Sequence, residues 1–252
     1  METTATVPFS STRAYVLEAR YEFLRLLRTP SFSLPCLLFP PVFYLLFGVL
    51  LGGKGGPAVA SYMLAGYGVF GVVGVALFGF GVTVAMDREQ GLLTLKRAQP
   101  MPPGAYLVAK MAMAMLFAAI ILLLLGALAT GVAGVRLAPM QWLLLSTTCL
   151  LGVLPFSALG LWLGTLVSGS GAPALINLVY LPMAFLSGLW VPLAMLPPVL
   201  QSMAPVWPAY HLAQLAQKIV GVDAGGSAWL HLGVLAAITG VFFTLARRRL
   251  VQ

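Results

Sequence analysis

The sequence predicts an all-α integral membrane protein, and two observations carry this prediction. Of its 252 residues, 60% are apolar and only 8% are charged, whereas an ordinary soluble domain has about 25% charged residues. The mean hydropathy is +0.99, and the apolar residues form continuous runs about twice as long as the roughly 10-residue strands of a membrane barrel. So few charges could not cover a fold in water, which excludes soluble enzymes, disordered chains and fibrous repeats.

The first element is an amphipathic helix expected over residues 12–30. Glu18, Glu22 and Arg25 fall on one narrow face, at positions i, i+4 and i+7, beside a broad apolar arc. Pro30 ends the helix because proline disfavours helical backbone at the residue before it. A segment with this many charges enters hydrocarbon only at high cost, so we expect it to lie in the cytoplasmic membrane interface rather than to extend the first span.

Six apolar stretches then follow, each long enough for a helix of about 20 residues to cross a bilayer. They lie near residues 34–51, 62–86, 105–130, 140–167, 173–192 and 228–246. None contains an acidic residue, and Lys110 is their only basic one. We therefore expect one transmembrane domain over residues 1–252, with six transmembrane helices.

The basic residues predict the orientation of these helices. Six spans place both termini on one side of the membrane. Eleven Lys and Arg residues fall on that side: Arg13, Arg20, Arg25, Arg28, Arg88, Lys96, Arg97, Lys110, Arg247, Arg248 and Arg249. Three fall on the other: Lys54, Arg136 and Lys218. Because basic residues favour the cytoplasmic side, we expect a multi-pass protein of the inner (plasma) membrane with both termini cytoplasmic. The net charge of +8 then reflects topology, and we expect lipid rather than nucleic acid as a partner.

The segment 87–104 is a charged loop on the cytoplasmic side. Its acids, Asp87 and Glu89, come first, and its bases, Lys96 and Arg97, follow. A short helix with this order of charges would match the helix dipole. Two interpretations remain open, a docking site for a soluble partner and a solvated loop whose charge only sets topology.

The segment 192–220 is the second irregular region. Five prolines fall between Pro192 and Pro208, so the segment is too broken to cross the membrane and too apolar to be a free loop. We expect a re-entrant, proline-rich hairpin of short helices on the outer face, anchored by Trp190 and Trp207.

Residues that could carry chemistry are few. Gly48 to Gly55 fits the phosphate-loop pattern GxxxxGK, but Gly55 stands where Ser or Thr would hold Mg²⁺, and no βαβ strand precedes it. The two histidines have no acidic partner at membrane depth. We expect no catalytic, cofactor or metal site on this chain. Ser157, Asn177 and Tyr180 are the best polar candidates to line a pathway, although ordinary interhelical hydrogen bonds would also explain them.

The pattern as a whole resembles ABC-2 type transporter permeases. Arg25-Leu-Leu-Arg-Thr-Pro30 before the first span looks like the junction between interfacial helix and span in that family. Asp87-Arg-Glu-Gln-Gly91, followed by Pro100 and then Lys110, is similar to its charged stretch. Pro208-x-x-His211 with Gln217 resembles its signature between the fifth and sixth spans.

This resemblance implies the membrane subunit of an ATP-driven exporter. Such permeases dimerise, and two separate ATP-binding subunits, which hold the ATP and Mg²⁺, dock on the cytoplasmic side. The docking role would fall to Glu18, Glu22, Arg25, Asp87, Arg88, Glu89, Gly91, Lys96 and Arg97, with Ser168–Gly171 as a second contact. The alternatives are an assembly or sensor subunit that transports nothing and, further from the pattern, an intramembrane enzyme.

Overall fold

The computed structural model describes residues 11–52, 56–98, 102, 104–222 and 226–251, and the side chains of Arg97, Leu250 and Val251 lie outside its description. Gly53–Gly55 of the glycine-rich stretch, and Pro100, also lie outside the described residues. All regular structure in the described ranges is helical. This confirms the predicted all-α class.

Five helical stretches of the described chain are long and apolar enough to cross a membrane. They are Pro30–Leu50, Gly56–Glu89, Ala105–Gly131, Pro139–Gly164 and Ala228–Arg249. The first comprises α2 (Pro30–Phe43) and the π-helical η1 (Tyr44–Leu50), and the second comprises α3 (Gly56–Ala76), the π-helical η3 (Leu77–Val82) and α4 (Thr83–Glu89). The others are α6 (Ala105–Gly131), α7 (Pro139–Leu151) with α8 (Val153–Gly164), and α12 (Ala228–Val251). They correspond to five of the six predicted spans.

The remaining predicted span, 173–192, is represented by a shorter helix, α9 (Ala172–Leu186). Fifteen residues of α-helix measure about 22 Å, which is less than the roughly 30 Å hydrocarbon core. The chain then turns at Gly188, whose φ of +74° favours glycine, and does not continue as helix to Pro192. The predicted helix end is therefore too late, because a uniformly apolar run gives no sign of a turn at a glycine.

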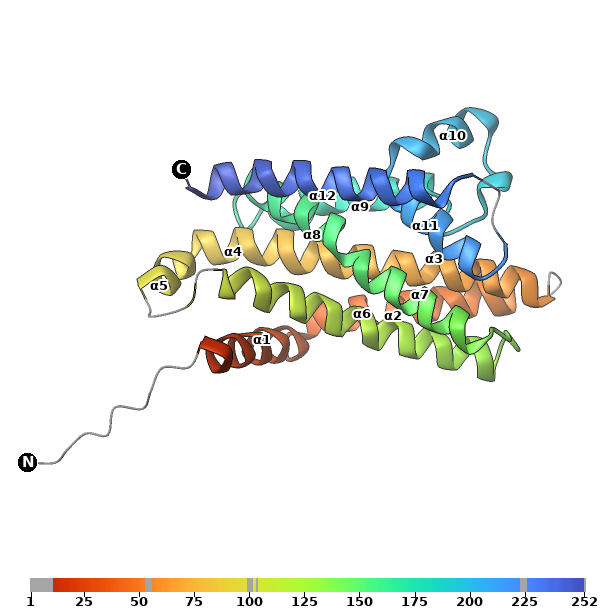
Figure 1. Ribbon diagram of the computed structural model, residues 1–252, viewed down its shortest axis with the longest axis horizontal. Helices are drawn as coiled ribbons and strands as arrows, with labels where there is room; N and C mark the ends of the chain where they lie inside the picture. The colour runs from red at the N-terminus through yellow and green to blue at the C-terminus, as the bar shows by residue number, and fades with distance from the viewer. Residues whose placement is uncertain (1–10, 53–55, 99–101, 103, 223–225, 252) are drawn as a thin grey trace, which may run out of the picture.

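The spans lie roughly side by side, and the two ends of the bundle differ (Figure 1). One end, which we call the charged end, carries α1 (Ser11–Leu27), α5 (Leu92–Ala98) and the last turn of α12 with Arg247–Arg249. The opposite end, the proline-rich end, carries η4 (Leu193–Met195), α10 (Pro198–Met203) and η5 (Ala204–Val206). Short helices are thus present where residues 192–220 predict them, and α11 (Pro208–Ile219) follows, packed against α3, α7 and α12.

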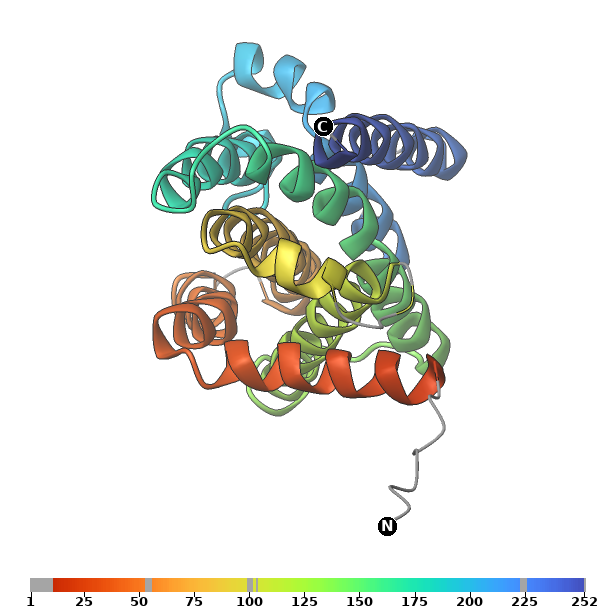
Figure 2. The same ribbon diagram turned by 90° about the vertical axis from the view of Figure 1, so that its left-hand side faces the viewer.

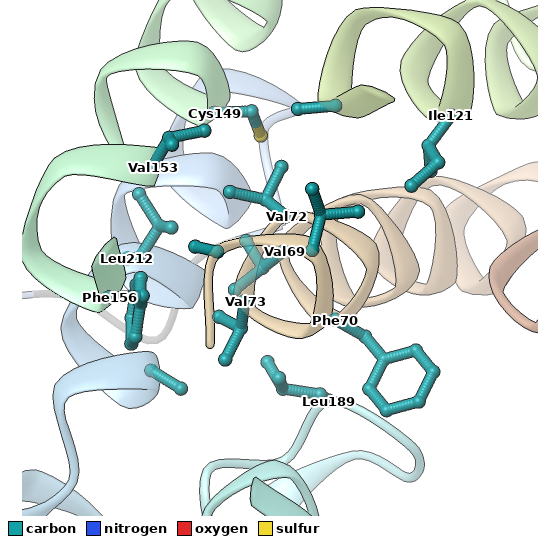
Figure 3. Packing of buried hydrophobic residues seen from close by; sticks show 14 of the residues in the cluster. Val69, Phe70, Val72, Val73, Ile121, Cys149, Val153, Phe156, Leu189 and Leu212 are labelled. Atoms are coloured by element: carbon teal, nitrogen blue, oxygen red, sulfur yellow. The ribbon is translucent and has the colours of Figure 1, made fainter. Parts of the chain in front are cut away.

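The helix α3 forms the centre of the bundle, with sixteen of its residues buried. Figure 3 shows Val69, Val72 and Val73 of this helix surrounded by side chains from α6, α7, α8 and α11. Such close packing depends on small residues. A Cβ on Gly160 would lie 3.0 Å from the Leu77 carbonyl oxygen, and one on Gly164 would lie 2.4 Å from that of Gly81. The Gly160-x-x-x-Gly164 pair therefore lets α8 lie directly against η3.

The N-terminal helix α1 crosses the charged end of the bundle instead of running along it (Figure 2). Its ends lie close to those of the predicted 12–30 segment. Its acidic face is turned partly toward the bundle rather than toward solvent. Glu22 and Leu26 are buried against the bundle, whereas Val16 and Tyr21 are exposed. This orientation brings Glu22 into contact with Lys110, a lysine buried inside the bundle.

Candidate functional site

Four charged side chains meet at the charged end, where α1 crosses α4 and α6. We call Glu22, Arg25, Asp87 and Lys110 the ionic cluster. The Lys110 ammonium lies 2.6 Å from Glu22 Oε1 and 3.0 Å from Asp87 Oδ2. The Arg25 guanidinium binds the same two carboxylates, with Nη2 3.0 Å from Glu22 Oε1 and Nη1 3.0 Å from Asp87 Oδ1. Two positive and two negative charges thus neutralise one another.

Three of the four cluster residues are buried, Arg25 is exposed at its edge, and the buried polar groups are hydrogen-bonded. Lys110 is fully buried, and Glu22 and Asp87 are nearly so. Tyr106 Oη donates to Asp87 Oδ2 at 2.7 Å, and Lys110 Nζ donates to Thr83 Oγ1 at 2.7 Å. A buried ion pair is tolerated only when such additional bonds satisfy its remaining atoms. Burial alone would lower the pKa of Arg25, but the Glu22 and Asp87 carboxylates outweigh it and the pKa is raised.

A second ion pair joins α1 to the short helix α5. Lys96 binds Glu18 at the edge of the cluster, and both side chains are partly exposed. Asp87 and Glu89 end α4, a turn with Gly91 at φ +71° follows, and α5 carries Lys96. The expected short charged helix is therefore present, but its acids belong to the preceding helix. The turn at Gly91 separates them, because only glycine adopts this φ readily.

The last turn of α4 also contacts the start of the α8–α9 connection. Arg88 Nη1 donates to the Gly164 carbonyl oxygen at 3.1 Å. A cavity of about 420 Å³ lies between Arg88, Glu89 and residues 165–168. A Cβ on Gly169 would lie 2.5 Å from Glu89 Oε2, so the Ser168–Gly171 turn passes directly beside this carboxylate. The end of α4 and the Ser168–Gly171 turn, both expected to contact a partner, therefore lie side by side.

The residues expected to dock a partner therefore occupy two kinds of position. Glu22 and Asp87 are buried, and their carboxylates face Lys110 and Arg25. Glu89 is exposed, and Glu18 and Lys96 are partly exposed. Lys110 was missed as a site residue, although an ionisable side chain inside an apolar run is a signal for a buried partner.

A second candidate site is an apolar cleft of about 380 Å³ between α2, α3 and α9, which we call the aromatic cleft. Seven of its sixteen lining residues are aromatic: Phe32, Phe39, Phe43, Phe70, Phe78, Tyr180 and Trp190. Asn177 lines it with an exposed carboxamide. The Tyr180 hydroxyl donates to the Phe70 carbonyl oxygen at 3.0 Å, above Gly74, where a Cβ would lie 2.8 Å from that hydroxyl.

Ser157 is separate from Asn177 and Tyr180. It lines a smaller cavity of about 150 Å³ between α8, η3, α6 and α12, beside Leu161 and Thr239. The structure therefore brings two of the three pathway candidates together in the aromatic cleft and places the third elsewhere. Ser157 and Asn177 are twenty residues apart and lie on successive helices. Their sequence spacing does not show whether the two side chains face the same cavity.

Buried histidines pair at the proline-rich end. His211 Nδ1 and His231 Nδ1 are 2.9 Å apart, and His211 Nε2 lies 2.9 Å from the Pro205 carbonyl oxygen. Among the described residues, no group of three or more His, Cys, Asp or Glu side chains could hold a metal ion. The pair links α11 to α12 through a hydrogen bond between the two rings.

A bundle of apolar spans, with a charged helix held across one end by ion pairs, defines a polytopic membrane protein. Residues 14–220 match the family described as ABC-2 type transporter. Because this match covers most of the chain, the protein belongs to the ABC-2 type transporter family and is a transport permease.

Two curated relatives agree with this assignment. YvfS of Bacillus subtilis, provisionally named a transport permease, is 28% identical over 231 residues, covering 90% of this chain and 92% of its own length. The inner membrane transport permease YhhJ of Escherichia coli is 29% identical over 172 residues. That alignment covers 67% of this chain and 46% of YhhJ, so the chain spans about half the length of this second relative.

Proposed function

We propose that this chain is the membrane subunit of an ATP-driven exporter, works as a dimer, and docks two separate ATP-binding subunits that carry ATP and Mg²⁺. In this proposal the charged end and both termini face the cytoplasm. The observation that carries it is the ionic cluster, which joins the crossing helix α1 to the spans of α4 and α6. Membership of the ABC-2 family supports a partner that supplies the energy.

The cluster gives α1 a mechanical role. Removing one partner of a buried ion pair costs about 3–5 kcal/mol, so α1 would move together with α4 and α6 rather than slide over them. A force that a partner applies to α1 or α5 would then tilt the spans. Glu22, Arg25 and Asp87 act in this scheme as positioning residues, and Arg88, Glu89, Gly91, Lys96 and Arg97, with Glu18, form the docking surface.

Charge reversal at Glu89 tests this docking surface. The carboxylate is exposed and lies beside the Ser168–Gly171 turn, away from the ionic cluster, so Glu89→Lys leaves the cluster intact. We expect co-purification of the ATP-binding subunit, and stimulation of its ATPase activity by the permease, to fall by at least about tenfold, because a like charge placed in an interface costs several kcal/mol and about 1.4 kcal/mol is already a factor of ten. Arg136→Glu, also at an exposed residue but at the proline-rich end, is the matched control and should change neither.

Two results would contradict the proposal. One is that no ATP-binding subunit co-purifies with the unaltered chain. The other is that Glu89→Lys and Arg136→Glu have the same effect, which would leave the charged end without a docking role.

A further inference from the structure

The aromatic cleft has an unusual wall. Helix α2 contains Pro35, Pro40 and Pro41 in its interior. Proline has no N–H, so the carbonyl four residues earlier loses its α-helical donor. Pro35 leaves the Ser31 carbonyl without this donor, and Pro40 leaves the Cys36 carbonyl without it.

The residues that carry these carbonyls lie on the face of α2 that borders the cleft. Ser31, Pro35, Cys36 and Pro40 are all lining residues, as expected of positions four apart on a helix, which share one face. The helix face that borders the cleft therefore belongs to residues whose carbonyls lack an α-helical donor, within otherwise apolar surroundings. An acceptor without a donor in such surroundings is costly and favours a ligand that brings positive charge or an N–H group.

The ring faces of the remaining lining residues favour the same charge, although Trp190 also carries a buried Nε1–H donor that has no partner. Seven are aromatic, and the face of an aromatic ring carries the negative part of its quadrupole. None of the sixteen lining residues is charged, so no Lys or Arg is present to receive an anionic group. Asn177 adds an amide oxygen that can accept a hydrogen bond.

From this geometry we infer that the aromatic cleft binds amphiphilic organic cations, with the apolar body against the rings and the positive charge near the carbonyls of Ser31 and Cys36. As a substrate class, this inference rests on the proposed export function. A cation whose charge is spread over a large apolar body fits best, because removing it from water costs less than removing a compact ammonium.

Two probes of equal size and shape but opposite charge test the inference. The full chain, in lipid nanodiscs of phosphatidylcholine, is titrated by equilibrium dialysis with tetraphenylphosphonium and with tetraphenylborate. Affinities are expressed against the probe concentration in the lipid, measured with empty nanodiscs. We expect saturable binding of the cation on the order of tenfold tighter than that of the anion.

Substitutions in α2 separate the carbonyl contribution from general hydrophobicity. Pro35→Ala restores a donor to the Ser31 carbonyl and should weaken cation binding about fivefold. Pro41→Ala restores a donor to Leu37 in the same helix, but neither Leu37 nor Pro41 lines the cleft, so affinity should not change. Phe39→Leu should weaken binding about fivefold, while Phe243→Leu, at an exposed phenylalanine outside the cleft, should not.

Three results would overturn the inference: no saturable binding of the cation, equal affinity for the anion, or equal weakening by Pro35→Ala and Pro41→Ala. Because the titration needs no ATP-binding subunit, it can fail while ATPase association succeeds. Conversely, cation binding without any associating ATPase would contradict the proposed function and leave the cleft's ligand class standing.

Discussion

Lys110 lies at the centre of the ionic cluster and has no exposed surface. Lys110→Met would leave Glu22 and Asp87 sharing only Arg25, with a net negative charge in a buried site. We expect a loss of about 3–5 kcal/mol in the free energy of unfolding, measured by denaturant titration of the purified protein in detergent. Adding Glu22→Gln to Lys110→Met should recover part of the loss, because it removes the excess charge.

The pair Lys96–Glu18 provides the matched comparison, because it joins the same helix α1 to α5 at partly exposed positions. Lys96→Met should cost less than about 1 kcal/mol, as partly solvated ion pairs contribute little. Equal costs for Lys96→Met and Lys110→Met would contradict the assignment of the buried cluster as the main attachment of α1.

His211 predicts a dependence of stability on pH. The Pro205 carbonyl can only accept, so His211 Nε2 carries a hydrogen and Nδ1 of the neutral ring accepts from His231. Burial lowers the pKa of His211, and the Pro205 carbonyl opposes this only in part. A base with a lowered pKa in the folded state contributes its stability above the unfolded pKa of about 6.5 and loses it as the pH falls through the folded value.

We therefore expect the Tm to be constant from pH 8 to 7 and to fall by about 2–4 °C per kcal/mol lost below pH 6. His211→Gln keeps an N–H donor for Pro205 but cannot be protonated, so its Tm should fall less over the acidic range. Thermal unfolding monitored by tryptophan fluorescence measures both. An identical acid response in the two proteins would assign the effect to other groups.

The sequence shows that Lys110 is the only charge inside the apolar runs, but not which residues bind it. Glu22 lies 88 positions earlier in the chain and Asp87 lies 23 earlier. Nothing in one sequence relates such separations to distance in space. The partner choice depends on how α1 crosses the bundle, which is a property of the packed structure.

At the scale of elements, α8 and η3 are in direct backbone contact. Gly164→Val would place its Cβ 2.4 Å from the Gly81 carbonyl oxygen, which belongs to the backbone and cannot rotate away. We expect a loss of about 1–3 kcal/mol or more from forced separation of the two helices, measured as a lower unfolding midpoint. The same change should weaken the Arg88 bond to the Gly164 carbonyl.

Gly240→Ala is the control for this substitution. A Cβ on Gly240, in α12, meets nothing within 4 Å, and alanine is about 1 kcal/mol better than glycine in a helix interior. Its midpoint should stay the same or rise. A drop equal to that of Gly164→Val would show that any added side chain disturbs this bundle.

Hydropathy was sufficient to find the long helices but not their internal irregularities. Tyr44–Leu50 and Leu77–Val82 are π-helical, and α7 gives way to α8 at Gly152. An apolar run has the same hydropathy whether its hydrogen bonds span four residues or five. Such details, like the early end of α9, follow from contacts between helices.

For the molecule as a whole, the distribution of charge was the most informative feature of the sequence. The basic residues assigned to one side before the fold was known lie, where described, at the charged end: Arg25, Arg88, Lys96 and Lys110 by their contacts, and Arg247–Arg249 at the end of α12. Arg136 follows α6 at the other end. The positions of Lys and Arg in the sequence therefore predicted which helix ends share one end of the bundle, without any knowledge of packing.

The same asymmetry predicts the orientation in the membrane. In a chain with Cys36 and Cys149 replaced by Ser, we introduce Thr94→Cys in α5 or Arg136→Cys after α6, both at exposed positions. In sealed right-side-out vesicles, a membrane-impermeant maleimide should label Arg136→Cys at once and Thr94→Cys only after permeabilisation, because the side with more Lys and Arg stays in the cytoplasm. The reverse pattern would place the charged end outside, where no ATP-binding subunit could reach it, and would contradict both the topology and the proposed export function.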